Sequence, residues 1–231
     1  MMNNTRIIDH YPRNITYECG KKAFEQMEKC ICKVKVGNVQ GTGFFCKIPF
    51  PTPQNLLRVF ITTSHIIPIN VLYPKNSKIQ IKIKEEKDIK ILDLDNRLKY
   101  ANKEYDITII EIKDEDNINN FLELDDNIMM GISNNNVRNE EYIDETIYLI
   151  HYPQGELSIS FGVLEQIYED NKYDFIHKCF TSPGSAGSPI LNLKNKIIGL
   201  HQGSTMNKLN KFNIGLFLNY PIKEFILINS H

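Results

Sequence analysis

The chain has 231 residues, 42% of them apolar, and its 27 basic and 28 acidic residues leave a formal net charge of −1. This apolar content is too high for a disordered chain, and a nearly neutral chain has no global field that would favour nucleic acid or an anionic membrane. Residues 1–9 contain no apolar signal-peptide core, and no run of about 18 apolar residues occurs. We therefore expect a cytoplasmic protein without a membrane span.

The pattern of elements begins with polar, irregular residues 1–20, which predict a flexible N-terminal arm, followed by a short amphipathic helix over 21–30. Beyond it, short apolar or alternating runs are separated by Asn, Gly, Pro and Asp, which is typical of an all-β sandwich or barrel. A closing helix is predicted over 221–229, with proline in its first turn. The expected strands are 31–36, 43–48, 59–63, 79–84, 107–113, 146–151, 157–167, 175–179, 189–193, 197–202 and 213–218.

The acidic, Asn-rich stretch 114–146 is the best candidate for a connection between two halves of the chain. We place the N-terminal half at 21–125 and the C-terminal half at 126–231.

The cysteines are odd in number, and none shows the C-x-x-C spacing of a zinc site. We expect them to be reduced and partly buried, and we expect neither metal nor cofactor. They are Cys19, Cys30, Cys32, Cys46 and Cys179.

Three short segments carry the candidate chemistry. His65 ends an apolar run, Asp106 precedes another, and the loop Gly184–Pro189 reads Gly-Ser-Ala-Gly-Ser-Pro. Each segment alone is weak, because a histidine at a strand end is more often structural and a Gly-Ser loop is usually only a loop. Together, however, they follow one of the chain orders known for a histidine–aspartate–nucleophile triad.

In this order, and with Gly-Thr-Gly-Phe at 41–44, the segments resemble the trypsin-like peptidases, most closely the glutamyl endopeptidase branch, over residues 30–228. The resemblance implies two antiparallel six-stranded β-barrels, a cleft between them and a C-terminal helix. It implies His65 as general base, Asp106 as the group that orients its imidazole, and an oxyanion hole made by the N–H groups of Gly184 and Ala186. The expected partner is a protein or peptide substrate, and the oligomeric state stays open.

Ala186 departs from the family, which has serine at this position. Alanine has no hydroxyl, so no acyl-enzyme can form. We expect neither Ser185 nor Ser188 to replace it, because a change of register turns the side chain away from His65. Two explanations remain: an engineered Ser-to-Ala form of an active protease, or a natural pseudo-protease that binds peptides or scaffolds partners. We favour the first, because the histidine and the aspartate are retained.

The resemblance also places a specificity pocket at Thr181, His201 and Gly203. In glutamyl endopeptidases a threonine and a histidine at the matching places hold a glutamate side chain. We therefore predict cleavage after Glu, or else after Gln or Asp, although His201 could instead be a satisfied core histidine. Phe180 stands where a trypsin-like pocket carries aspartate, which argues against cleavage after Lys or Arg. Ser185 stands where trypsins place the acid that pairs with a new N-terminus, so we expect no such zymogen switch.

Overall fold

The computed structural model describes residues 11–84, 86, 88–134, 137–206 and 211–230. Half of the predicted arm, residues 1–10, lies outside the described residues. Its last four residues were assigned wrongly, because helix α1 runs from Tyr17 to Lys29. The Thr16 side chain caps this helix by accepting a hydrogen bond of 3.2 Å from the backbone N–H of Cys19, which satisfies one of the unpaired amides of the first turn.

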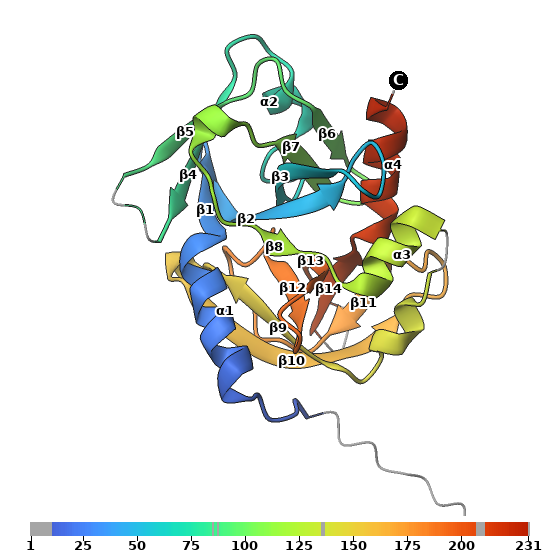
Figure 1. Ribbon diagram of the computed structural model, residues 1–231. Coiled ribbons are helices and arrows are strands. Elements are labelled where there is room, and N and C mark those ends of the chain that lie inside the picture. The colour runs from blue at the N-terminus through green and yellow to red at the C-terminus, as the bar shows by residue number, and fades with distance from the viewer. Residues whose placement is uncertain (1–10, 85, 87, 135–136, 207–210, 231) are drawn as a thin grey trace, which may run out of the picture.

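The N-terminal half is one sheet with the strand order β5-β4-β1-β2-β3-β7-β6, and β8 pairs with β2 (Figure 1). Residues 79, 81 and 83 of β4 are buried and Lys78 and Gln80 are exposed, which is the period of two that the sequence suggested. The described strands of this half form an open path of pairings, so the first of the two predicted barrels is a half-barrel sheet. The strands are β1 (Ile31–Val36), β2 (Val39–Pro49), β3 (Leu56–Thr62), β4 (Lys78–Ile83), β5 (Lys90–Asp93), β6 (Lys99–Asn102), β7 (Ile107–Glu111) and β8 (Leu122–Glu123).

The C-terminal half is a closed barrel of six strands in the order β10-β11-β14-β13-β12-β9. This half confirms the predicted barrel, and together the two halves have the mostly β architecture of a double-barrel fold (Figure 1). The strands are β9 (Thr146–His151), β10 (Ser158–Ile167), β11 (Asp174–His177), β12 (Pro189–Asn192), β13 (Ile197–Met206) and β14 (Lys211–Phe217).

Short helices fill the connections. The stretch predicted to join the halves contains β8 and the helix α3, whose Ile128 and Ile132 are buried. The predicted closing helix is confirmed as α4, which begins two residues earlier than expected. The helices besides α1 are α2 (Ile69–Leu72), α3 (Asp126–Asn134) and α4 (Asn219–Asn229), with 3-10 turns at Asp114–Asp116, Asn139–Tyr142 and Pro153–Gly155.

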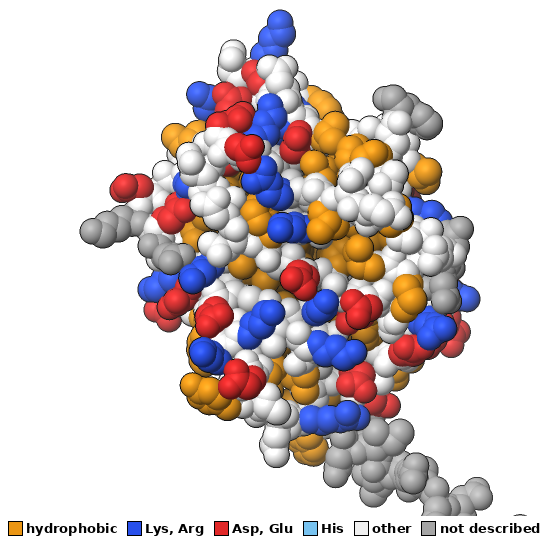
Figure 2. Space-filling view, in the orientation of Figure 1, with side chains coloured by type: hydrophobic (Ala, Val, Ile, Leu, Met, Phe, Trp, Pro, Cys, Tyr) orange, Lys and Arg blue, Asp and Glu red, His pale blue; other side chains and the backbone are white. Residues whose placement is uncertain are grey.

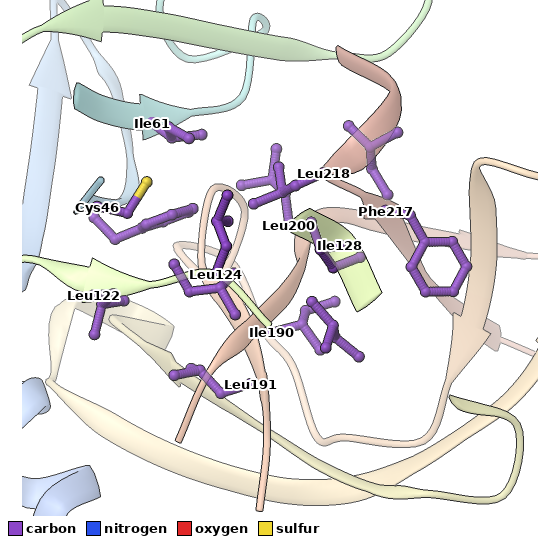
Figure 3. Close-up of a cluster of buried hydrophobic side chains, with 14 of the residues drawn as sticks. Cys46, Ile61, Leu122, Leu124, Ile128, Ile190, Leu191, Leu200, Phe217 and Leu218 are labelled. Atoms are coloured by element: carbon purple, nitrogen blue, oxygen red, sulfur yellow. The ribbon is translucent and has the colours of Figure 1, made fainter. Parts of the chain in front are cut away.

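One buried cluster spans the two halves, and a second lies within the first sheet. Figure 3 shows Cys46 and Ile61 of the first sheet converging with Ile190 and Leu200 of the barrel, and all four are buried. All five cysteines are buried thiols without a disulfide. Acidic and basic side chains are intermingled over the face in Figure 2, consistent with the balanced charge. Among the described residues, no helix is long and apolar enough to cross a membrane.

Each terminal helix packs on the half that lies farther away in the sequence. From α1, the Gln26 side-chain amide donates to the backbone carbonyl of Asn195 in the barrel at 2.9 Å. From α4, the Phe225 ring lies edge-on to the Tyr100 ring of the first sheet, with centroids 6.2 Å apart. The two halves are thus held together at both ends of the chain as well as through the shared core.

Candidate active site

His65 and Asp106 are brought together by the pairing of β3 with β7, because His65 follows the first strand and Asp106 immediately precedes the second. The His65 Nδ1 lies 2.7 Å from the Asp106 Oδ2. Since a carboxylate only accepts hydrogen bonds, Nδ1 carries the proton, and the Nε2 of the neutral ring is left as a base. About half of the His65 side chain, 49%, is exposed.

Further bonds hold the Asp106 carboxylate in place. Its Oδ1 accepts hydrogen bonds from the Ser64 hydroxyl at 2.9 Å and from the His65 backbone N–H at 3.0 Å. Asp106 has φ +45°, in the left-handed region, which aspartate tolerates better than most residues. The carboxylate is therefore fixed both by its partners and by its own backbone.

The loop that carries Ala186 depends on two glycines with positive φ. Gly184 has φ +99°, and a Cβ there would lie 2.3 Å from the Tyr152 carbonyl oxygen. Gly187 has φ +85°, and a Cβ there would lie 2.0 Å from the Thr42 carbonyl oxygen. Only glycine fits at either position, so the close approach of two other backbone segments requires both glycines of the Gly-Ser-Ala-Gly sequence.

Thr42 of β2 connects the first sheet to this loop. Its backbone N–H donates to the Ala186 carbonyl oxygen at 2.9 Å, and its hydroxyl donates to the Gly184 carbonyl oxygen at 2.8 Å. The same hydroxyl accepts the Tyr152 backbone N–H at 3.0 Å. The motif at 41–44 flagged this residue, but its contacts with a loop so distant in sequence could not be foreseen.

Two backbone amides of the loop point away from other protein acceptors. The Pro183 carbonyl oxygen accepts a 2.7 Å hydrogen bond from the Gln154 backbone N–H. This bond turns the Gly184 N–H to the opposite side of the trans peptide plane. Within the described residues, neither the Gly184 N–H nor the Ala186 N–H has a hydrogen-bond acceptor. The two predicted oxyanion-hole donors are therefore available to a ligand.

The neighbouring serines are both engaged elsewhere. The buried Ser185 hydroxyl accepts the Ser182 N–H at 3.1 Å and lies 2.9 Å from the His151 Nδ1. The Ser188 hydroxyl is fully buried and donates to the Ser185 carbonyl oxygen. Neither serine can therefore act in place of residue 186 without breaking these bonds. Burial lowers the pKa of His151 to about 4, so this imidazole is neutral near pH 7.

The predicted pocket residue Thr181 is part of a small hydroxyl–amide cluster. Its hydroxyl donates to the Asn213 side-chain oxygen at 2.7 Å, and the Ser204 hydroxyl does so at the same distance. The Asn213 amide is oriented by a 2.7 Å bond to the Cys179 carbonyl oxygen. No motif singled out Asn213, whereas Ser204 follows the predicted Gly203 directly.

The other predicted pocket residue, His201, is supported by a second buried histidine. The His177 Nδ1 accepts the Cys179 backbone N–H at 3.3 Å, and the His177 Nε2 lies 3.0 Å from the His201 Nδ1. The His177 proton is therefore on Nε2 and is donated to His201, which leaves Nε2–H as the remaining donor of His201. Burial and the neighbouring histidine lower the pKa of His201 well below its usual range, and burial lowers the pKa of His177 to about 3.

Several of the groups described above line one cavity of about 440 Å³. Six of the seven predicted site residues line it, and the seventh, Asp106, bonds to His65 behind it. No group of three or more possible metal ligands occurs among the described residues. The predicted residues that line the cavity are His65, Thr181, Gly184, Ala186, His201 and Gly203, joined by Ser204 and Gln202.

A double β-sheet fold with a hydrogen-bonded histidine–aspartate pair beside two available loop amides defines a protein of the chymotrypsin-fold serine protease class. The sequence profile of the trypsin-like peptidase domain matches residues 41–200. The chain therefore belongs to the trypsin-like peptidase family.

The relatives agree with this assignment. A glutamyl endopeptidase of Staphylococcus epidermidis is 33% identical over 98 residues, which cover 42% of this chain and 32% of the relative. The matched region thus spans about a third of the length of that curated relative.

Solved structures share the fold at low sequence identity. A serine endoprotease from Yersinia pestis is 11% identical, with a TM-score of 0.62 over 95% of this chain and 69% of that one. The Rv3671c protease of M. tuberculosis H37Rv, in an inactive serine-to-alanine form, is 12% identical, with a TM-score of 0.61 over 95% of this chain and 98% of that one. A human pathogenic astrovirus serine protease is 15% identical, with a TM-score of 0.55 over 90% of this chain and 94% of that one.

Proposed function

We propose that this chain has the active site of an endopeptidase that cleaves peptide bonds after glutamate, and that Ala186 makes the present form bind substrate without cleaving it. The observation that carries the proposal is the His65–Asp106 pair at 2.7 Å, in one site with two loop amides that lack acceptors. A pair in this tautomer and beside such donors is what acyl transfer requires.

With serine at position 186, the chemistry follows from the geometry. The His65 Nε2 would take the hydroxyl proton as the serine oxygen attacks the substrate carbonyl carbon. Asp106 would stabilise the resulting imidazolium, and the Gly184 and Ala186 amides would bind the negative oxygen of the tetrahedral intermediate. His65 would then pass the proton to the leaving amine. Alanine removes only the nucleophile, so binding is retained while acylation is lost.

The preference for glutamate rests on the donors of the pocket. The Thr181 and Ser204 hydroxyls already donate to Asn213, so the His201 Nε2–H is the pocket donor that a carboxylate or amide oxygen can satisfy. A substrate without such an acceptor leaves this N–H unpaired, which is the basis of strong discrimination. The likeness to the S. epidermidis glutamyl endopeptidase supports the same preference.

The test is the Ala186→Ser variant. We expect it to react with a fluorophosphonate and to cleave a peptide library mainly after Glu, while Ala186→Ser combined with His65→Ala does neither. Dominant cleavage after Arg would contradict the specificity.

The second candidate function is a natural pseudo-protease that captures peptides or scaffolds partners, which Ala186 itself favours. It predicts that Ala186→Ser stays inert while peptides still bind.

A further inference from the structure

We propose that the chain as it stands is a receptor for a free peptide C-terminus, specifically one whose last residue is glutamate. This inference rests on the proposed function, because it uses the same pocket and the same loop amides. It adds the class of ligand: an α-carboxylate seated where a scissile carbonyl would lie, in place of an internal peptide bond.

The loop amides supply the first part of the argument. The N–H groups of Gly184 and Ala186 have no acceptor within the described residues, and both residues line the cavity. An internal peptide bond offers these two donors one carbonyl oxygen without formal charge. A terminal carboxylate offers a charged oxygen at the same place, and hydrogen bonds to ionised acceptors are about twice as strong as neutral ones.

His65 supplies the second part. Its Nδ1 is committed to Asp106, so its Nε2 is the nitrogen left for a ligand. When the ring carries a second proton, its Nε2–H can donate to the second carboxylate oxygen while the Nδ1–H stays bonded to Asp106. An internal peptide bond has no second oxygen to accept this proton. A free C-terminus therefore satisfies three donors at once, whereas a continuing chain satisfies two.

Because Ala186 has no hydroxyl, the site keeps a bound peptide and does not cleave it. A serine hydroxyl at this position would compete for the His65 Nε2, and its oxygen would occupy space beside the ligand carbon. The Ala186 methyl is partly buried against the core of the first sheet and makes no polar demand. Among the described residues, the His65 Nε2 then has only the Thr63 hydroxyl, at 3.5 Å, within hydrogen-bond range.

The residues of the predicted specificity pocket determine which terminal residue is accepted. The cavity is open and holds about 440 Å³, with His201, Thr181 and Ser204 on its wall. A terminal glutamate brings its side-chain carboxylate to the His201 Nε2–H while its α-carboxylate meets the loop amides. The ligand then carries two negative charges, and different donors bind each of them.

The test compares three fluorescein-labelled hexapeptides by anisotropy with the unaltered chain. The first ends in glutamate with a free carboxylate, the second is the same peptide as its carboxamide, and the third is extended by two alanines. We expect the free carboxylate to bind about tenfold tighter than either of the others, reflecting the added charge-assisted bonds. Equal affinities, or no binding of the free carboxylate, overturn the proposal.

Two variants locate the effect. His65→Gln should remove most of the preference for the carboxylate, with folding checked by circular dichroism. Lys194→Gln removes an exposed cation in the turn that follows β12, at the other end of that strand from Ala186, and should leave the preference intact. A preference that survives in His65→Gln, or that falls equally in Lys194→Gln, contradicts the role given to His65.

The same measurements separate this proposal from the endopeptidase proposal. If Ala186→Ser cleaves after Glu and the three peptides bind equally, the endopeptidase stands and the C-terminal receptor falls. If the carboxylate is preferred and Ala186→Ser is inert, the receptor stands and the protease parent falls. If nothing binds and nothing is cleaved, both fall.

Discussion

The backbone amide of Thr42 donates a 2.9 Å hydrogen bond to the carbonyl oxygen of Ala186, so a strand of the first sheet holds the loop that belongs to the second half. The same residue contacts the loop again through its hydroxyl, which donates to the Gly184 carbonyl oxygen. The first sheet, which carries both His65 and Thr42, therefore holds Ala186 in place through these two bonds.

Replacing Thr42 should disturb the loop without removing any reacting group. In the Ala186→Ser background, Thr42→Val leaves the Gly184 carbonyl and the Tyr152 N–H without their partner, a loss of roughly 1–3 kcal/mol. We expect kcat to fall by about tenfold or more, with a smaller change in KM. Thr42→Ser keeps the hydroxyl and serves as the matched control. Equal kinetics for Thr42→Val and the parent would refute the role of this hydroxyl.

His177 should control specificity through His201. His177→Phe fills a similar volume but removes the donor that fixes the His201 tautomer. In the Ala186→Ser background we expect KM for glutamate substrates to rise by about tenfold, and the Glu-over-Gln selectivity to change, because the pocket donor is no longer oriented. The rate of fluorophosphonate labelling reports the triad alone and should stay near its parental value. A parallel loss of labelling would show a general structural defect instead.

Ser185 should contribute stability rather than nucleophilic activity. Ser185→Ala leaves the Ser182 N–H and the His151 Nδ1 unpaired in a buried place, which costs about 1–3 kcal/mol. The melting temperature of the Ser185→Ala variant should be several degrees lower than that of the parent. In the Ala186 chain this serine is expected not to react with fluorophosphonate. Labelling of the Ala186 chain that disappears in Ser185→Ala would reverse this assignment.

Acid should destabilise the fold through three buried histidines. Burial lowers the pKa of His151 to about 4 and of His177 to about 3, and lowers that of His201 as well. Between these values and the usual pKa of about 6.5, the unfolded chain binds more protons than the folded chain. The free energy of unfolding should therefore have its full value above pH 6.5 and decrease as the pH falls toward 4. The shifted pKa of His151 alone accounts for a decrease of roughly 3 kcal/mol.

Urea unfolding at pH 7.5 and pH 5 measures this dependence. The His177→Phe variant has one titrating histidine fewer and should show a shallower slope of stability against pH. A free energy of unfolding that does not change between the two pH values would contradict the assignment of neutral buried histidines.

The sequence predicted the strands with strong apolar patterns and missed those without one. Strands 31–36 and 146–151 have the predicted bounds. The short β6 was missed, because Lys99–Asn102 has only one buried position and forms as an edge strand on β7. The helix α3 was missed because its short apolar run lies inside an acidic, Asn-rich stretch that was interpreted as a connection. Open pairing in the first sheet is a tertiary property that strand patterns do not encode.

The candidate site divides in the same way. His65, Asp106 and Ala186 lie in local motifs, so their order along the chain was enough to single them out. His177 and Asn213 act only through contacts across the barrel, with His201 on β13 and with Thr181. Thr42 lies in a motif, yet its partners are more than a hundred residues away. Their roles arise from folding and could not be predicted from spacing.

The reciprocal placement of the terminal helices bears on how the molecule comes apart. The helix α1 precedes the first sheet but bonds to the barrel, and α4 follows the barrel but packs on the first sheet. Each half therefore contributes a terminal helix that contacts the other half. Cleavage of one peptide bond in the connection between α3 and β9 would leave two fragments that these contacts still hold together. Loss of either helix would remove one of these two contacts between the halves.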